Sequence, residues 1–221
     1  MDHLTARYSR REDIANSITH GIGFLLSVVG LWLLVTISRT NGDAWHVFSC
    51  IIYGTTLICL FTASTLYHSI HPPKFKPFLR TLDHSTIFLL IAGTYTPFTL
   101  VTLRGPWGWS IFSIIWALAV FGIIFQKAML RKGPMVSVGF YLLMGWVVVA
   151  AVKPMLSLVA PGGLILLLLG GLSYTIGVVF YAWKRMPYNH AVWHLFVLAG
   201  SACHFFAVLL YVIPRTPAGT L

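Results

Sequence analysis

The stretch Gly162-Gly-Leu-Ile-Leu-Leu-Leu-Leu-Gly-Gly-Leu-Ser-Tyr-Thr-Ile-Gly-Val-Val-Phe-Tyr-Ala-Trp183 contains no charged residue. An α-helix rises 1.5 Å per residue, so about 20 such residues cross the ~30 Å hydrocarbon core of a bilayer. Comparable apolar stretches recur along the whole chain. They predict one all-α membrane domain over residues 1–221, a seven-transmembrane helix bundle with spans at about 19–38, 46–68, 84–103, 109–127, 135–153, 162–183 and 191–213.

The composition agrees with a membrane protein. Of 221 residues, 57% are hydrophobic and only 9% are charged, whereas a soluble domain averages roughly 25% charged residues. A water-soluble protein is therefore excluded. A transmembrane β-barrel is excluded too, because its strands read as ~10-residue alternating segments. The first apolar run is too long for a signal peptide and is therefore retained as the first span. Residues 1–18, which precede it, are predicted to be a cytoplasmic segment with a short helix.

The basic residues predict the orientation of the bundle. The formal net charge of +10 would suggest nucleic-acid binding in a soluble chain, but here the cations lie at helix ends and we expect no nucleic-acid partner. Cytoplasmic loops carry the excess of Lys and Arg. Eleven Lys and Arg residues lie on the side of the N-terminus and four on the other side, which predicts a cytoplasmic N-terminus and an external C-terminus. The eleven are Arg7, Arg10, Arg11, Lys74, Lys76, Arg80, Lys127, Arg131, Lys132, Lys184 and Arg185, and the four are Arg39, Arg104, Lys153 and Arg215.

Small residues and one proline predict details of packing. Small residues recur at helical spacing on the sixth and first spans, which predicts seams of close helix approach at Gly163, Gly170 and Gly177, and at Gly23, Ser27 and Gly30. Pro97 lacks a backbone N–H, so it should kink the third span.

The segment before the first span carries a helix-start motif. Ser9-Arg-Arg-Glu12 matches the capping box S-x-x-E and predicts a helix that begins near residue 10. Glu12, Asn16 and His20 follow at intervals of four residues, which makes a polar stripe that leads into the first span. We expect Glu12 to be a capping partner, and the spacing does not tell which way His20 faces.

The last span opens with a histidine pair, His190-Ala-Val-Trp-His194. At 100° per residue the two rings lie on one face about 6 Å apart along the axis, a spacing suited to one metal ion. Ser201 and His204 fall on the same face. An ionisable residue inside a membrane span suggests a functional site.

Two other spans bring polar residues to the same depth. The second span ends in Ser64-Thr-Leu-Tyr-His68, and the third begins at Asp83-His84. Because consecutive spans alternate in direction, these residues and the His190/His194 pair meet at the cytoplasmic end of the bundle. Three imidazoles make a tetrahedral zinc site with one position open for water, the pattern of catalytic zinc.

A purely structural interpretation stays open at this point. A histidine near a headgroup interface is ordinarily a hydrogen-bonded interfacial residue. Asp83 would then cap the third span and Asn189 the last, and Ser64 would bond back to a carbonyl of its own helix. His84 points about 100° away from Asp83 and is interpreted as structural.

At these residues the chain resembles bacterial hemolysin III proteins of the inner membrane, relatives of the progestin and adipoQ receptor (PAQR) family and of the alkaline ceramidases. The resemblance covers essentially the whole chain. It is carried by Glu12-Asp-Ile-Ala-Asn-Ser-Ile-Thr-His-Gly21, Ala63-Ser-Thr-Leu-Tyr-His68, Asp83-His84, Ala92-Gly-Thr-Tyr-Thr-Pro-Phe98, Met144-Gly-Trp146 and Pro187-Tyr-Asn-His-Ala-Val-Trp-His194.

The resemblance implies a seven-helix fold with the N-terminus inside the cell and Zn²⁺ held by three histidines. The metal ligands would be His68, His190 and His194, with Asp83 beside the zinc-bound water and Ser64 nearby as catalytic residues. In the ceramidases such a site hydrolyses a lipid amide. The hemolysin name implies cytolysis, which nothing in these residues explains.

Three functions are open to test. The first is a zinc-dependent hydrolase of a lipid amide or ester, whose partners are membrane lipids and a lipid substrate in the bacterial inner membrane. The second is a receptor, scaffold or membrane-homeostasis protein with structural zinc. The third is a transporter, disfavoured because spans four to six contain no Asp, Glu or His in their interiors. The substrate and the oligomeric state do not follow from the sequence.

Overall fold

The computed structural model describes residues 9–213 of the chain. Within them, seven helical segments are long and apolar enough to cross a membrane, and no strand occurs. This confirms the all-α, seven-helix membrane class. The elements are α1 (Arg10–Asn41), α2 (Ala44–Ser69), α3 (Lys76–Pro97), the π-helix η1 (Phe98–Thr102), α4 (Pro106–Lys132), α5 (Pro134–Gly145), the 3-10 helix η2 (Trp146–Ala151), α6 (Val152–Leu158), α7 (Pro161–Ala182) and α8 (Asn189–Tyr211).

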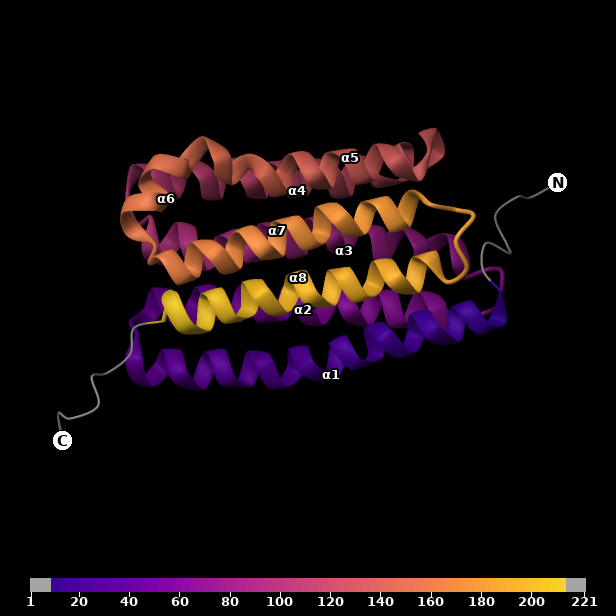
Figure 1. Cartoon of the computed structure of the whole chain (residues 1–221), viewed down its shortest axis with the longest axis horizontal. Coiled ribbons are helices and arrows are strands. Elements are labelled where there is room, and N and C mark those ends of the chain that lie inside the picture. The colour runs from indigo at the N-terminus through magenta and orange to yellow at the C-terminus, as the bar shows by residue number, and fades with distance from the viewer. Residues whose placement is uncertain (1–8, 214–221) are drawn as a thin grey trace.

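The spans form a closed ring in chain order. Each span packs against its neighbours in the sequence, and α8 packs back on α1. Figure 1 shows the spans running side by side, with the beginning of α1 and the end of α8 at opposite ends of the bundle. We call the end at which α1, α3 and α8 begin the histidine end. The predicted orientation in the membrane stays a prediction, and Arg7 and Arg215, two of the counted cations, lie outside the described residues.

The first span starts where the capping box predicts. Ser9 Oγ accepts a hydrogen bond from the Glu12 backbone N–H, and the Glu12 carboxylate accepts one from the Ser9 N–H. The helix then continues without a break to Asn41, so the motif begins the first span itself and not a separate short helix. The third span likewise begins earlier than residue 84, at Lys76, with Pro77 in its first turn.

The glycine seams lie where the spacing predicts. Gly163, Gly170 and Gly177 are buried on α7, and a side chain at Gly170 would overlap the His204 ring of α8. On α1, Gly23 faces Phe61 of α2 and Gly30 faces Phe205 of α8. These small residues let the helix backbones approach closely, as in other membrane bundles.

Pro97 changes the helix type of the third span. The α-helical hydrogen-bond pattern ends at Pro97 and continues as the π-helix η1. The reason is that proline has no N–H to donate to the preceding turn.

The fifth span, predicted over residues 135–153, is broken into three helical pieces. α5 ends at Gly145, η2 follows, and α6 completes the crossing. Backbone groups freed by a break must find partners inside a membrane. Tyr95 of α3 provides them, since its hydroxyl donates to the Gly145 carbonyl at 2.7 Å and accepts from the Val148 N–H at 2.9 Å. The β-branched Val147–Val149 and Pro154 in α6 also disfavour a regular helix.

Candidate metal centre

The histidine cluster consists of His68, His190 and His194. His68 lies at the end of α2, and the other two occupy the first turns of α8. Each ring offers one nitrogen, and these atoms lie within 4.8 Å of one another. The ring centroids are 4.5 to 5.3 Å apart. All three side chains are buried, so residues separated by more than half the chain meet in the bundle interior.

Asp83 and Ser64 lie beside this cluster. Both are buried, and both line the same cavity as His190 and His194. The cavity measures about 490 Å³ and continues from the histidine end between α3, α5, α7 and α8. Its remaining walls are mostly apolar. A polar end joined to an apolar chamber of this size is typical of small-molecule sites.

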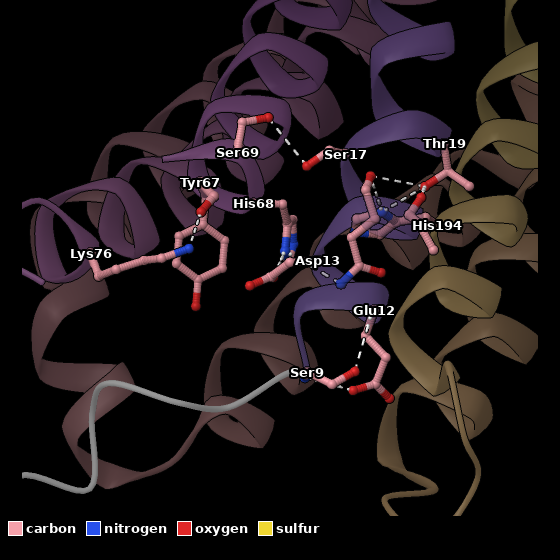
Figure 2. A network of polar contacts seen from close by, with 12 residues as sticks. Ser9, Glu12, Asp13, Ser17, Thr19, Tyr67, His68, Ser69, Lys76 and His194 are labelled. Atoms are coloured by element: carbon pink, nitrogen blue, oxygen red, sulfur yellow. Dashed lines mark hydrogen bonds and ion pairs between the residues drawn. The ribbon is translucent and has the colours of Figure 1, made fainter. Parts of the chain in front are cut away.

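Asp13, which the sequence motifs did not single out, also belongs to this site. Its carboxylate Oδ1 lies 2.8 Å from Nδ1 of His68, and both groups are buried. Figure 2 shows this contact between the start of α1 and the end of α2. The sequence contains a pattern that points to Asp13, because Asp13, Asn16 and His20 follow one another at intervals of three and four residues. This is the spacing of a buried helix face. The predicted stripe began one residue too early, at Glu12, which serves as the cap.

The first turns of α1 also contact His194. Nδ1 of His194 lies 3.1 Å from Thr19 Oγ1 and 3.3 Å from the Asn16 carbonyl oxygen. The Asn16 side-chain amide lies 3.3 Å from Nδ1 of His68. His20, whose direction the sequence left open, stacks on the His194 ring at 3.5 Å between centroids and lines the cavity.

The interpretation of Asp83 and Asn189 as helix-capping residues is wrong in both cases. Asp83 does not cap the third span, because α3 begins two turns earlier, at Lys76. Asn189 does not cap α8 with its side chain but donates from Nδ2 to the carbonyls of Phe180 and Tyr181 at the end of α7. Both errors arise because the polar first turns of a helix extend beyond its apolar core, which is the only part that hydropathy detects.

The donor set fits zinc. Zinc binds neutral imidazole nitrogens, and it most often has four ligands in a tetrahedral arrangement. A carboxylate only accepts hydrogen bonds, so Nδ1 of His68 carries the hydrogen and Nε2 carries the lone pair that can bind an ion. Asp13 and Asp83 add two buried carboxylates beside three imidazoles, which matches the charge of a divalent cation in a low-dielectric interior.

Three other histidines of the described residues, His204, His84 and His46, make contacts of their own. Nε2 of His204 lies 3.2 Å from the Leu167 carbonyl oxygen, so its ring joins α8 to α7. The backbone carbonyl of His84 accepts a hydrogen bond from the Tyr141 hydroxyl at 2.8 Å. His46 contacts Asp43 at the start of α2, far from the cluster.

The chain matches known proteins over nearly all of its length. Residues 8–205 match the family described as Haemolysin-III related. Hemolysin-3 of Bacillus cereus is 49% identical over 204 residues, which cover 92% of this chain and 93% of that protein. The Hemolysin-3 homolog of Bacillus subtilis (strain 168) is 45% identical over 206 residues, which cover 93% of this chain and 97% of that protein. The human monocyte to macrophage differentiation factor is 34% identical over 214 residues, which cover 93% of this chain and 86% of that protein.

Proposed function

The chain belongs to the haemolysin III family, and we propose that it is a zinc-dependent membrane hydrolase that cleaves an amide or ester bond of a lipid. One observation carries the proposal. Three buried histidines gather their nitrogens within 4.8 Å of one another, and two of them, His190 and His194, line the polar end of an otherwise apolar cavity together with Asp83 and Ser64.

The proposed ligands are His68, His190 and His194. A zinc ion held by these residues would lower the pKa of a bound water toward about 7 and polarise a carbonyl group. Asp83 accepts the proton of the attacking water and passes it to the leaving amine or alcohol. Ser64 donates a hydrogen bond to the carbonyl oxygen on which negative charge develops.

The apolar cavity holds the acyl chain of the substrate. Its wall includes Val149, Val152 and Leu156 of the broken fifth span and Leu168 of α7, and these side chains are exposed although they line the cavity. This supports a lateral entrance between the fifth span and α7, through which a chain reaches the cavity from the bilayer. The reacting bond then lies at the histidine end, at the level of the inner leaflet in the proposed cytoplasmic-N-terminus orientation and inner-membrane location.

The proposal is tested by zinc analysis and turnover together. We expect about one zinc per purified chain, lost in His68→Ala and in His194→Ala. Asp83→Asn should keep zinc and lose turnover of amide-linked and ester-linked lipids, because the amide cannot accept the proton. Retained turnover in Asp83→Asn would remove the assigned base. Stoichiometric zinc with no hydrolysis of any lipid in the wild type would instead favour a receptor or scaffold in which zinc is structural.

A further inference from the structure

The first three turns of α1 contact two histidines of the cluster, His68 and His194, and the residue that precedes α8, Tyr188. We propose that Glu12, Asp13, Asn16 and Thr19, which we call the α1 shell, orient the metal ligands, with Asp13 as the principal positioning residue. The inference deepens the proposed function and rests on metal binding by the cluster. It assigns a role to the polar start of α1, a segment that contributes no ligand and no reacting group.

Asp13 fixes the tautomer of His68. Its carboxylate lies 2.8 Å from Nδ1 of a ring that is fully buried. Because that nitrogen donates its hydrogen to the carboxylate, the lone pair is held on Nε2. A carboxylate behind a metal-binding imidazole also restricts the rotation of the ring. Asp13 itself lies in the first turn of α1, where the helix dipole favours negative charge.

The same tautomer is imposed on His194 by a different route. Thr19 Oγ1 is within donating distance of the Ala15 and Asn16 carbonyls, both at 2.9 Å, so its hydrogen is directed to its own helix. The lone pairs of Thr19 and of the Asn16 carbonyl then accept from Nδ1 of His194. Nε2 of His194 is consequently the nitrogen that can bind an ion. Two histidines from different helices are thus placed in the same state by one segment.

Glu12 extends the shell toward the third histidine. Its Oε1 accepts a hydrogen bond from the backbone N–H of Tyr188 at 3.2 Å. Tyr188 adopts a left-handed backbone with φ 54° immediately before α8, a conformation that is costly for a bulky residue. The Glu12 contact supports this turn and so sets where α8, and with it His190, begins.

Zinc affinity is the first test, measured by competition with a chromogenic chelator. We expect Asp13→Ala to bind Zn²⁺ about 10- to 100-fold more weakly than the wild type, the range found for outer-shell partners. Asp13→Asn should lose less, because its amide oxygen still accepts from Nδ1. Ser17→Ala is the matched control, since the Ser17 hydroxyl joins the same helix to Ser69 of α2 at 3.2 Å rather than to a histidine; its affinity should not change.

A spectroscopic signature separates orientation from general stability. In protein loaded with Co²⁺, the visible bands report ligand geometry, so Asp13→Ala should shift them while Ser17→Ala leaves them unchanged. Thr19→Val provides a second variant acting through His194, should Asp13→Ala fail to fold. Unchanged zinc affinity and unchanged Co²⁺ bands in the folded variants would overturn the inference while leaving the proposed function intact. A wild type without zinc would overturn both.

Discussion

The histidine end and the break in the fifth span both place polar groups within membrane-spanning segments, but these groups find their partners differently. At the break, one tyrosine hydroxyl contacts the backbone on both sides of the gap, and the arrangement is complete within the protein. At the histidine end, α1 contacts Nδ1 of two rings, and one nitrogen from each of the three rings lies within 4.8 Å of the others. The difference suggests that the break is a structural feature and that the cluster is built for a ligand.

Removing the proposed zinc ion should have the largest effect and should act on the histidine end alone. Zinc at 1,000 times its dissociation constant stabilises a fold by about 4 kcal/mol if it binds only the folded state. Excess chelator should therefore lower the unfolding midpoint of the wild type markedly in detergent micelles. The midpoint of His68→Ala should not respond, and an equal response of both proteins would show that the chelator acts elsewhere.

Tyr95→Phe should break the other half of the comparison. The variant leaves the Gly145 carbonyl and the Val148 N–H without the hydroxyl, and no water replaces it within a membrane span, so each unsatisfied group costs about 1–3 kcal/mol. We expect a loss of about 3 kcal/mol of stability with unchanged zinc content. Tyr174→Phe is the control, because its hydroxyl contacts the Ser201 side chain, at 2.9 Å, and serine can bond back to its own helix. A loss of zinc in Tyr95→Phe would show that the two regions are coupled.

Gly108→Ala should test tight packing at the end opposite the cluster. A Cβ at Gly108 would lie 2.1 Å from the Thr99 carbonyl oxygen and 2.6 Å from that of Leu103. These are backbone atoms, so α4 must move away from η1, at a cost of about 2 kcal/mol. Gly139→Ala in α5, where no atom of the described residues lies within 4 Å of a new Cβ, should be neutral or stabilising by up to about 1 kcal/mol. Thermal unfolding of the two variants in parallel checks the contrast.

The smallest effect concerns Asp43, which caps α2. Hydrogen bonds from the His46 side chain, and from the backbone of His46 and Trp45, lower its pKa from 3.8 to about 2. Because the folded state favours the ionised carboxylate, the stabilisation is present above pH 4 and is lost as the pH falls toward 2. Asp43→Ala should cost about 1 kcal/mol at neutral pH, as for other N-caps. Unfolding midpoints between pH 2 and pH 5 should depend less on pH in Asp43→Ala than in the wild type.

The sequence determined the number of spans and the depth of each polar motif. Apolar length fixes how many helices cross the membrane, and the alternating direction of consecutive helices fixes the end at which each residue lies. For this reason the amino-acid sequence alone predicts that His68, His190 and His194 lie at one end of the bundle. The glycine seams followed from spacing alone, because small residues on one helix face have few other uses in a membrane.

Only the tertiary structure decided which faces meet. Asp13 and Glu12 are adjacent carboxylates at the start of one helix, and the rotation of α1 against α2 gives the first to His68 and the second to the cap and Tyr188. The break after Gly145 likewise depends on Tyr95, a residue of another span. Contacts between helices depend on rotation and on partners distant in the sequence, whereas periodicity within one segment records only that segment's own apolar face.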